Sequence, residues 1–275
     1  MSLFRALAVF LISILPCISA TFGTVVFHTD ALSDLVLDES RKRMYVLDPI
    51  SNQVEVYSIA TKSPAPSSFI NLDTNCEPFS MALSPAASAG ASPQFLYVAC
   101  YATQSLDVID LTKLVKTASV TLLAAPEAVA VGSDGKVLVS TIGTSTGQNI
   151  LTIYDPSPTA PAVLRSVLNP PGAPAVVTLP LGTPYLAGHA RMQATPNGNT
   201  IIGVHETTTT RTVFVYDVAS ATVLRSRTVT GQSTVLAMSP DGSRFMAGFT
   251  LYDVATLSAL GQMNNANAQI GRAHV

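Results

Sequence analysis

The feature that most constrains this chain is a unit of sequence that recurs five times. Each unit contains a short apolar strand, a turn, a second strand and a triplet similar to Val-Tyr-Asp. The triplets are Val56-Tyr57-Ser58, Val108-Ile109-Asp110, Ile153-Tyr154-Asp155, Val215-Tyr216-Asp217 and Leu251-Tyr252-Asp253. Their spacing scatters around the roughly 40 to 50 residues of a four-stranded blade, and such a unit must stack on its neighbours to bury both faces. The repeat therefore predicts an all-β fold, a β-propeller of four-stranded blades.

Apolar residues at every second position, flanked by Gly, Pro, Asn and Asp, predict five hairpins near the centre of this fold. We expect them at 32–37 with 43–47, 79–84 with 95–100, 127–131 with 136–141, 191–194 with 200–205, and 235–239 with 244–249. Three of these hairpins turn through Asp134-Gly135, Asn197-Gly198 and Asp241-Gly242. Such dipeptides favour tight turns because Gly adopts positive φ without steric cost.

Two irregularities interrupt the repetition. The link between the third and fourth repeats, residues 169–188, is rich in Pro and predicts a stiff, extended excursion that we interpret as a specificity loop. The fifth repeat has an unusually short distance between its turn Gly and its triplet. Either its second hairpin loop is lost or its third strand lies elsewhere.

The charge balance excludes two classes of partner. The chain has 15 basic and 17 acidic side chains, and only 12% of its residues are charged. It contains no basic run longer than Arg41-Lys42-Arg43. Because nucleic acids and anionic membranes are recognised through clustered basic residues, we expect neither as a partner.

Residues 1–20 are expected to be a signal peptide. Arg5 supplies a positive start, residues 7–15 are apolar apart from Ser13, and Ala20 is a small residue before a plausible cleavage site. The apolar run is shorter than the roughly 20 residues that cross a bilayer, so we expect no membrane insertion after cleavage. The mature protein is then extracytoplasmic, either periplasmic or secreted.

The C-terminal residues 269–275 are expected to be an artefact. Residues 270–275 are the translation of a common sequencing-library adapter, and Gln269 fits the reading frame of that adapter. The propeller then occupies residues 21–268, with about four complete blades and a partial fifth in an incomplete ring. Residues 24–27 would supply the outer strand of a final blade that is missing, because propellers close by joining the two chain ends.

Export affects the interpretation of the cysteines. Signal cleavage removes Cys17 and leaves Cys76 and Cys100 in an oxidising compartment, where a disulfide is favoured. The alternative is two separate buried thiols. A hairpin turning near Gly90 would bring both residues to one rim, which favours the disulfide and predicts Cα atoms within roughly 7 Å.

The second and third repeats carry a family resemblance. Residues 96–101, 106–110, 125–131 and 133–136 resemble the YVTN family of β-propeller repeats, and the similarity extends over about residues 31–260. The position of the family's Asn is held by Asp48, Cys100, Ile142, His205 and Phe249. The resemblance implies an exported bacterial protein similar to WD40-like and lactonase-like propellers, and it transfers no catalytic residue.

Few residues indicate chemistry. His28, His189 and His205 show no metal-ligand spacing, and no nucleophile motif or phosphate-binding loop is present. We predict no catalytic residue, no metal and no cofactor. The topology instead predicts a ring of polar residues at one mouth of the central channel, a concave place where ligands bind. These candidates are Asp34, Glu77, Glu127, Arg191, His205 and Glu206. The alternative for them is solvated ion pairs of little energetic value.

These patterns favour a non-catalytic binding module for a protein or glycan over an enzyme. A lactonase-like or other propeller hydrolase is the first alternative, although the ring contains a cation where acidic ligands would be needed. A structural part of a larger surface protein is the second.

Overall fold

The computed structural model of the protein describes residues 28, 31–61, 63–88, 90–142, 150–157, 165–166, 190–206, 211–229 and 235–262. The expected signal peptide, the segment 24–27, the Pro-rich link and the C-terminal tail lie outside the described residues. In the described ranges the chain is all-β. They contain no helix with the length and apolar character needed to span a membrane.

The described strands form five antiparallel sheets of four strands, which we call blades 1 to 5 in chain order. Blade 1 consists of β1 (Asp34–Asp38), β2 (Arg43–Asp48), β3 (Gln53–Ser58) and β4 (Ser68–Asn71). Blade 2 consists of β5 (Pro78–Leu83), β6 (Phe95–Cys100), β7 (Ser105–Asp110) and β8 (Val115–Thr121). Blade 3 consists of β9 (Ala125–Val131), β10 (Val137–Ile142), β11 (Ile150–Tyr154) and β12 (Arg165–Ser166). Blade 4 consists of β13 (Ala190–Ala194), β14 (Thr200–Glu206), β15 (Arg211–Asp217) and β16 (Thr222–Val229). Blade 5 consists of β17 (Leu236–Met238), β18 (Arg244–Ala247), β19 (Thr250–Asp253) and β20 (Ala259–Gln262).

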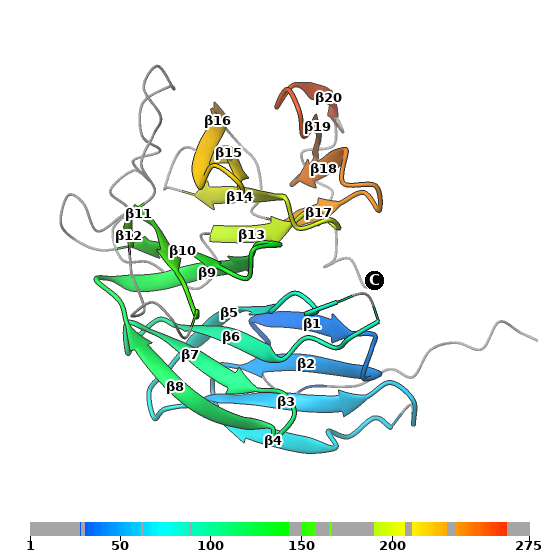
Figure 1. Cartoon of the computed structure of the whole chain (residues 1–275), viewed down its shortest axis with the longest axis vertical. Helices are drawn as coiled ribbons and strands as arrows, with labels where there is room; N and C mark the ends of the chain where they lie inside the picture. Colours follow the sequence, from blue (N-terminus) through cyan, green and yellow to red (C-terminus); the bar gives the residue numbers. More distant parts are fainter. Residues whose placement is uncertain are drawn as a thin grey trace, which may run out of the picture.

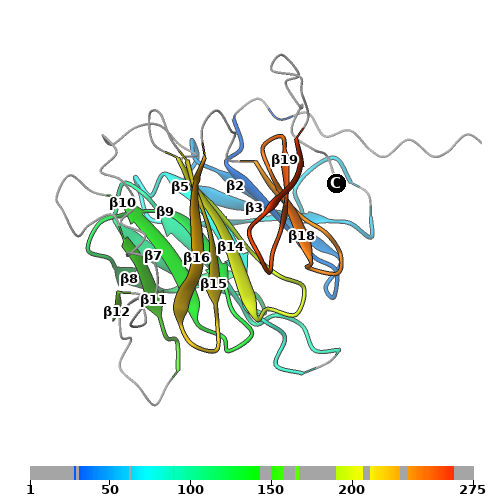
Figure 2. The same cartoon turned by 90° about the horizontal axis from the view of Figure 1, so that it is seen from above.

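The blades follow one another in an arc (Figure 1). The first strand of each blade contacts the first strand of the next, in the order β1, β5, β9, β13, β17. Seen from above, blade 4 stands between the green strands of blade 3 and the orange strands of blade 5 (Figure 2). No described strand of blade 5 pairs with blade 1, so the described strands do not form a closed ring. The prediction of an all-β propeller with an incomplete ring is confirmed.

Four apolar clusters fill the interfaces between successive blades. Tyr45 of blade 1 and Leu96 of blade 2 belong to the first cluster, and both are fully buried. The second and third clusters join blade 2 to blade 3 and blade 3 to blade 4, and the fourth joins blade 4 to Phe245 and Tyr252 of blade 5. Because strand residues alternate between the two faces of a sheet, each inner blade places apolar residues on both sides. Stacking of the blades therefore supplies the core.

The outward-facing sides of blades 1 and 5 are more exposed. In blade 1, Leu35, Val46, Glu55 and Phe69 are paired across the four strands and share this side. In the two edge strands Leu35 is 50% exposed and Phe69 is 53% exposed, whereas Val46 and Glu55 between them are buried. In blade 5, Leu260 is 50% exposed. Apolar side chains therefore remain in solvent at both ends of the described arc.

The turns follow the predicted chemistry. Gly135, Gly198 and Gly242 have φ values of 79°, 69° and 71°, the left-handed conformation that Gly adopts at low cost. The acids that end four of the triplets accept hydrogen bonds from main-chain N–H groups two or three residues later. These bonds are Thr112 to Asp110 at 2.8 Å, Ser157 to Asp155 at 3.0 Å, Ser220 to Asp217 at 2.8 Å and Thr256 to Asp253 at 2.8 Å. The triplets thus end the third strands and cap the following turns.

The fifth repeat differs from the expected fragment. It has four paired strands, but they are only three or four residues long. Gly248 and Phe249 alone connect β18 to β19, and Gly248 has a φ of 59°. The second hairpin loop is thus shortened and the third strand is in its normal place. A two-residue turn replaces the longer loop of the other blades, so four strands fit within the short distance between the turn Gly and the triplet.

Blade 4 contains a close approach between a glycine and an aromatic ring. Gly203 of β14 is paired with Phe214 of β15, and Phe214 is buried. A Cβ atom added to Gly203 would lie 2.0 Å from the Cζ atom of Phe214. The aromatic ring therefore occupies the space that a side chain at position 203 would need.

A disulfide joins Cys76 and Cys100. Their Cα atoms are 4.6 Å apart, within the bound of roughly 7 Å that we expected. Cys100 ends β6, and Cys76 lies just before β5. Both cysteines are fully buried. The bond therefore fastens the entry of the chain into blade 2 to the second strand of that blade.

Candidate functional site

The strand ends at one mouth of the ring bring together four of the six predicted rim residues. Asp34 begins β1, Glu127 lies near the start of β9, Arg191 lies at the start of β13, and His205 lies at the end of β14. Antiparallel order places the start of a first strand beside the end of a second strand, so these positions share one rim. The four side chains come from three different blades.

Arg191 spans the mouth. Its Nη1 atom donates a hydrogen bond to the carbonyl oxygen of Phe79 at 3.1 Å, and its Nη2 atom donates to the carbonyl oxygen of Ser33 at 2.8 Å. The guanidinium of blade 4 is therefore bound to blades 1 and 2. Among the described residues, no carboxylate lies within ion-pair distance of it. The alternative of a solvated ion pair does not describe Arg191, because main-chain carbonyls are its partners.

Glu127 and His205 form a buried pair. Glu127 Oε2 lies 3.6 Å from His205 Nε2, and the residues are 3% and 1% exposed. Burial raises the pKa of Glu127 to about 7, and the positive charge of Arg191 opposes part of that rise. The carboxyl group therefore gains a proton near neutral pH. A titrating group in this range is a marker of functional sites, although buried structural pairs show it as well.

Asp34 is held by main-chain donors. Its Oδ2 atom accepts a hydrogen bond from the N–H of Met81 at 2.9 Å, and its Oδ1 atom accepts one from the N–H of Leu35 at 2.9 Å. Burial among surrounding protein atoms raises the pKa of Asp34, and Arg191 and these hydrogen bonds offset part of the effect. Asp34 thus connects the first strands of blades 1 and 2.

The other two rim candidates are an exposed turn residue and a residue whose side chain is not described. Glu77 is exposed and has a φ of 48°, and its main-chain N–H donates to Asn52 Oδ1 at 2.8 Å. The main chain of Glu206 pairs with Arg211 at the end of β14, and its side chain is not among the described groups. We expected all six residues to ring the mouth. Glu77 occupies an exposed turn before β5. Burial raises the pKa of Tyr101, and the negative charges of Glu127 and Glu77 both raise it further, so the two acids share this neighbour.

The sequence did not indicate the polar groups that complete the mouth. Ser80 Oγ accepts a hydrogen bond from the N–H of Val129 at 3.3 Å, and Ser33 Oγ donates to the carbonyl oxygen of Pro78 at 2.7 Å. Ser residues occur throughout this chain, so their type carried no signal. Hydrogen bonds of these serines, of Asp34 and of Arg191 therefore join neighbouring blades at the mouth.

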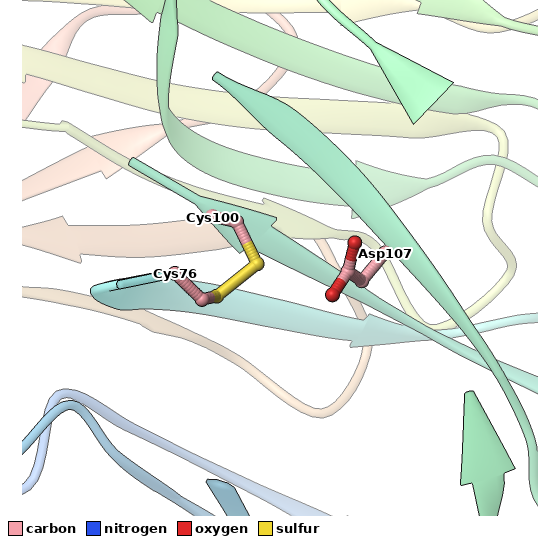
Figure 3. A group of neighbouring side chains, drawn as sticks. All are labelled: Cys76, Cys100 and Asp107. Carbon is pink, nitrogen blue, oxygen red and sulfur yellow. A yellow bond between two sulfur atoms is a disulfide. The ribbon is translucent and has the colours of Figure 1, made fainter. Parts of the chain in front are cut away.

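A second group of neighbouring side chains consists of the disulfide and one acid, Asp107. The sulfur atoms of Cys76 and Cys100 and a carboxylate oxygen of Asp107 lie within 4.8 Å of one another (Figure 3). Because the sulfur atoms are bonded to each other, they are not thiolate ligands for a metal. Asp107 is fully buried, with Lys116 Nζ at 3.6 Å from Oδ2, and burial raises the pKa of this carboxyl group. The group is therefore a buried acid beside a disulfide.

An open hollow lies between blades 4 and 5. It has a volume of about 350 Å³ and is lined by Arg225, Ser226, Arg227, Thr256, Leu257 and Ser258. Arg225 and Arg227 pair with Val215 and Val213, which belong to the cluster packed against blade 5. Residues two apart in a strand share one side, so both arginines face blade 5. The described residues place no carboxylate within ion-pair distance of either arginine.

Comparisons with known proteins identify the fold class. No protein-family model and no curated protein sequence matches the chain. Kuenenia stuttgartiensis hydrazine synthase is similar in structure, with a TM-score of 0.59 and 17% identity over 86% of this chain and 61% of that chain. The Myceliophteria thermophila Cps50 (Swd1) β-propeller domain gives a TM-score of 0.59 and 12% identity over 86% of this chain and 70% of the domain. The Dos1 propeller gives 0.53 and 15% over 88% of this chain and 60% of that chain.

These similarities establish a β-propeller fold. The identities are too low to transfer an activity, since one fold supports many functions. The chain spans 61% of the length of the hydrazine synthase chain and 60% of the Dos1 propeller chain.

Proposed function

We propose that this chain is an exported bacterial β-propeller of the YVTN type that acts as a non-catalytic binding module for a protein or glycan. The observation that carries the proposal is the open hollow between blades 4 and 5. Arg225 and Arg227 present two guanidinium groups there, and Thr256 and Ser258 line the same space. Guanidinium groups bind carboxylate, sulfate and phosphate groups through paired hydrogen bonds. A ligand that carries such a group fits this surface.

The channel mouth supports binding over catalysis. Arg191 donates its hydrogen bonds to two carbonyl oxygens, and Glu127 and His205 are almost fully buried. A hydrolase needs a nucleophile or base that a substrate can reach. The closest acid and imidazole at the mouth are enclosed by the blades, so their arrangement favours a structural connection between blades.

The hollow is tested by removing its charges. The Arg225→Ala/Arg227→Ala variant and the wild type are screened by calorimetry and on an array of acidic and neutral glycans at low salt. We expect acidic glycans to bind the wild type and to lose at least about tenfold in affinity for the variant, because charge-assisted hydrogen bonds are lost. Lys42→Ala/Lys113→Ala is the control, since it removes two charges from turns of blades 1 and 2.

The outcome separates the candidate functions. Equal weakening in the control and in the arginine variant would show that only net charge matters. Turnover of lactones by the wild type, abolished by Glu127→Gln, would favour the lactonase-like alternative, for which the raised pKa of Glu127 is the supporting observation. Export is tested independently by fractionating cells that express the full chain and locating it by immunoblot.

A further inference from the structure

The outward-facing side of blade 1 contains a cluster of one histidine and two buried acids. His28, Asp48 and Glu55 each offer one ligand atom, and these atoms lie within 4.8 Å of one another. Asp48 is 2% exposed and Glu55 is 6% exposed. This group was not predictable from the sequence, because His28 and Asp48 lie 20 positions apart, with the hairpin of β1 and β2 between them.

Strand register explains why the two acids meet. Glu55 of β3 is paired with Val46 of β2, and Asp48 lies two residues beyond Val46. Residues two apart in a strand share one side of the sheet, so Asp48 and Glu55 are diagonal neighbours. His28 precedes β1, and its Nε2 atom lies 3.2 Å from Glu55 Oε1. Nitrogen and oxygen atoms bound to one tetrahedral zinc ion are separated by about 3.4 Å, given bond lengths of about 2.1 Å.

Neighbouring groups hold both carboxylates in place. Tyr57 Oη donates a hydrogen bond to Glu55 Oε2 at 2.7 Å, which leaves Oε1 directed to His28. The N–H groups of Ile50 and Ser51 donate to Asp48 Oδ1 at 2.9 and 3.0 Å. Orientation of ligands by surrounding hydrogen bonds is typical of metal sites, where such partners fix the geometry of the ligands.

The charges of the cluster favour a cation. Two carboxylates, Asp48 and Glu55, are buried here beside a single imidazole. One imidazole, even when protonated, balances only one of two carboxylates. Buried charges are costly unless they are paired or bind a metal.

We propose that His28, Asp48 and Glu55 form a binding site for a divalent transition-metal ion, with Zn²⁺ as the ion that fits one imidazole and two carboxylates. A water molecule would complete the four ligands that zinc takes. The site goes beyond the proposed binding function, since it lies on blade 1 and away from the arginines of blade 4. Its role is to fasten the chain at His28, which precedes β1, onto β2 and β3.

The test uses the tag-free full chain, stripped with EDTA and titrated with Zn²⁺ by calorimetry and by competition with a chromophoric chelator. We expect one equivalent to bind and to raise the midpoint of thermal unfolding. His28→Gln and Glu55→Gln each remove a ligand and should weaken binding by at least about 100-fold. Tyr57→Phe removes only the support for Glu55 and should weaken it by about 10- to 100-fold.

Glu39→Gln is the matched control, because Glu39 is an exposed acid in the first turn of the same blade. It should bind Zn²⁺ as the wild type does. Circular dichroism of each metal-free variant identifies any that fail to fold, and Tyr57→Phe, which keeps all three ligands, remains informative in that case. The proposal is overturned if no equivalent of Zn²⁺ binds, if His28→Gln binds it unchanged, or if Ca²⁺ binds more tightly than Zn²⁺.

Discussion

Blades 2 and 5 have the same four-stranded topology but differ in how they are stabilised. The strands of blade 2 are six or seven residues long, apolar clusters lie on both of its sides, and a disulfide fastens its entrance. The strands of blade 5 are three or four residues long, and only blade 4 packs against it in the described structure. The stability of a repeat depends on its interfaces with neighbours. We therefore expect blade 5 to open before blade 2.

The largest expected effect comes from matched leucines in the two blades. Leu106→Ala in blade 2 should lower the free energy of unfolding by about 4 kcal/mol, because Leu106 is fully buried between blades 2 and 3. Leu251→Ala in blade 5 should cost about 1 kcal/mol, because Leu251 is half-buried on the outward side. Urea unfolding measures both values. Equal costs would show that blade 5 is as well packed as blade 2.

Removal of the disulfide should have the next largest effect. The Cys76→Ser/Cys100→Ser variant should lose about 3 kcal/mol, since the bond closes a loop with a sequence separation of 24 residues in the unfolded chain. Hydrogen exchange should speed up in β5 and β6 and stay unchanged in blade 5. Faster exchange in all five blades would contradict the view that each blade is a separate unit.

Glu127 should change the free energy of unfolding with pH by up to about 3 kcal/mol. Its pKa is about 7 in the folded protein and about 4.5 in the unfolded chain, so the folded state holds a proton that the unfolded state has released. Stability from this group is complete below pH 4.5 and declines as the pH rises to 7. Glu127→Gln should therefore be more stable than the wild type at pH 8 and equal to it near pH 4.

The control for this comparison is Glu77→Gln, which changes an exposed acid in blade 2. Its thermal unfolding is measured over the same pH range as that of Glu127→Gln and the wild type. If Glu127→Gln keeps the wild-type slope between pH 5 and 7, then the pH dependence does not come from Glu127.

The smallest expected loss of stability comes from Ala substitutions at two turn glycines. Gly135→Ala should lower the free energy of unfolding by about 1 kcal/mol, because Ala is strained at positive φ. The space around Gly135 is open, so no clash adds to this cost. Gly242→Ala in blade 5 should cost slightly more, since the new Cβ atom would lie 3.0 Å from the Cδ atom of Pro196 in blade 4. Thermal unfolding measures the difference. An equal cost would indicate that blade 5 shifts easily away from blade 4.

Local chemistry made the hairpins predictable from the sequence. All five central hairpins lie within a few residues of their expected positions, because alternation and Asp-Gly or Asn-Gly turns are properties of adjacent residues. The fourth strand of blade 5 was not expected, since β20 contains Gly261 and is short. The contacts of Arg191 were not predictable either. They depend on carbonyl groups of Ser33 and Phe79, and every residue has such a group.

The candidate sites were predictable only in part for a related reason. Glu127, Arg191 and His205 were placed at the mouth because the start of each first strand and the end of each second strand face the same rim. His28 was set aside because metal-ligand spacing along the chain was absent, whereas its neighbours Asp48 and Glu55 are brought to it by strand register. Register and side-chain direction decide such clusters, and they become visible only when the sheet is assembled.

The pairing of Gly203 with Phe214 couples the effects of substitutions at these two positions. A side chain at position 203 collides with the ring while Phe214 is present, so a substitution there is damaging by itself. Once Phe214 is replaced by a smaller residue, the same substitution at position 203 fills the vacated space. Replacement of Phe214 first leaves a cavity beside Gly203, and replacement of Gly203 first produces a clash, so either single change is damaging. The two positions are therefore epistatic, because the pair of changes costs less than the sum of the two single changes.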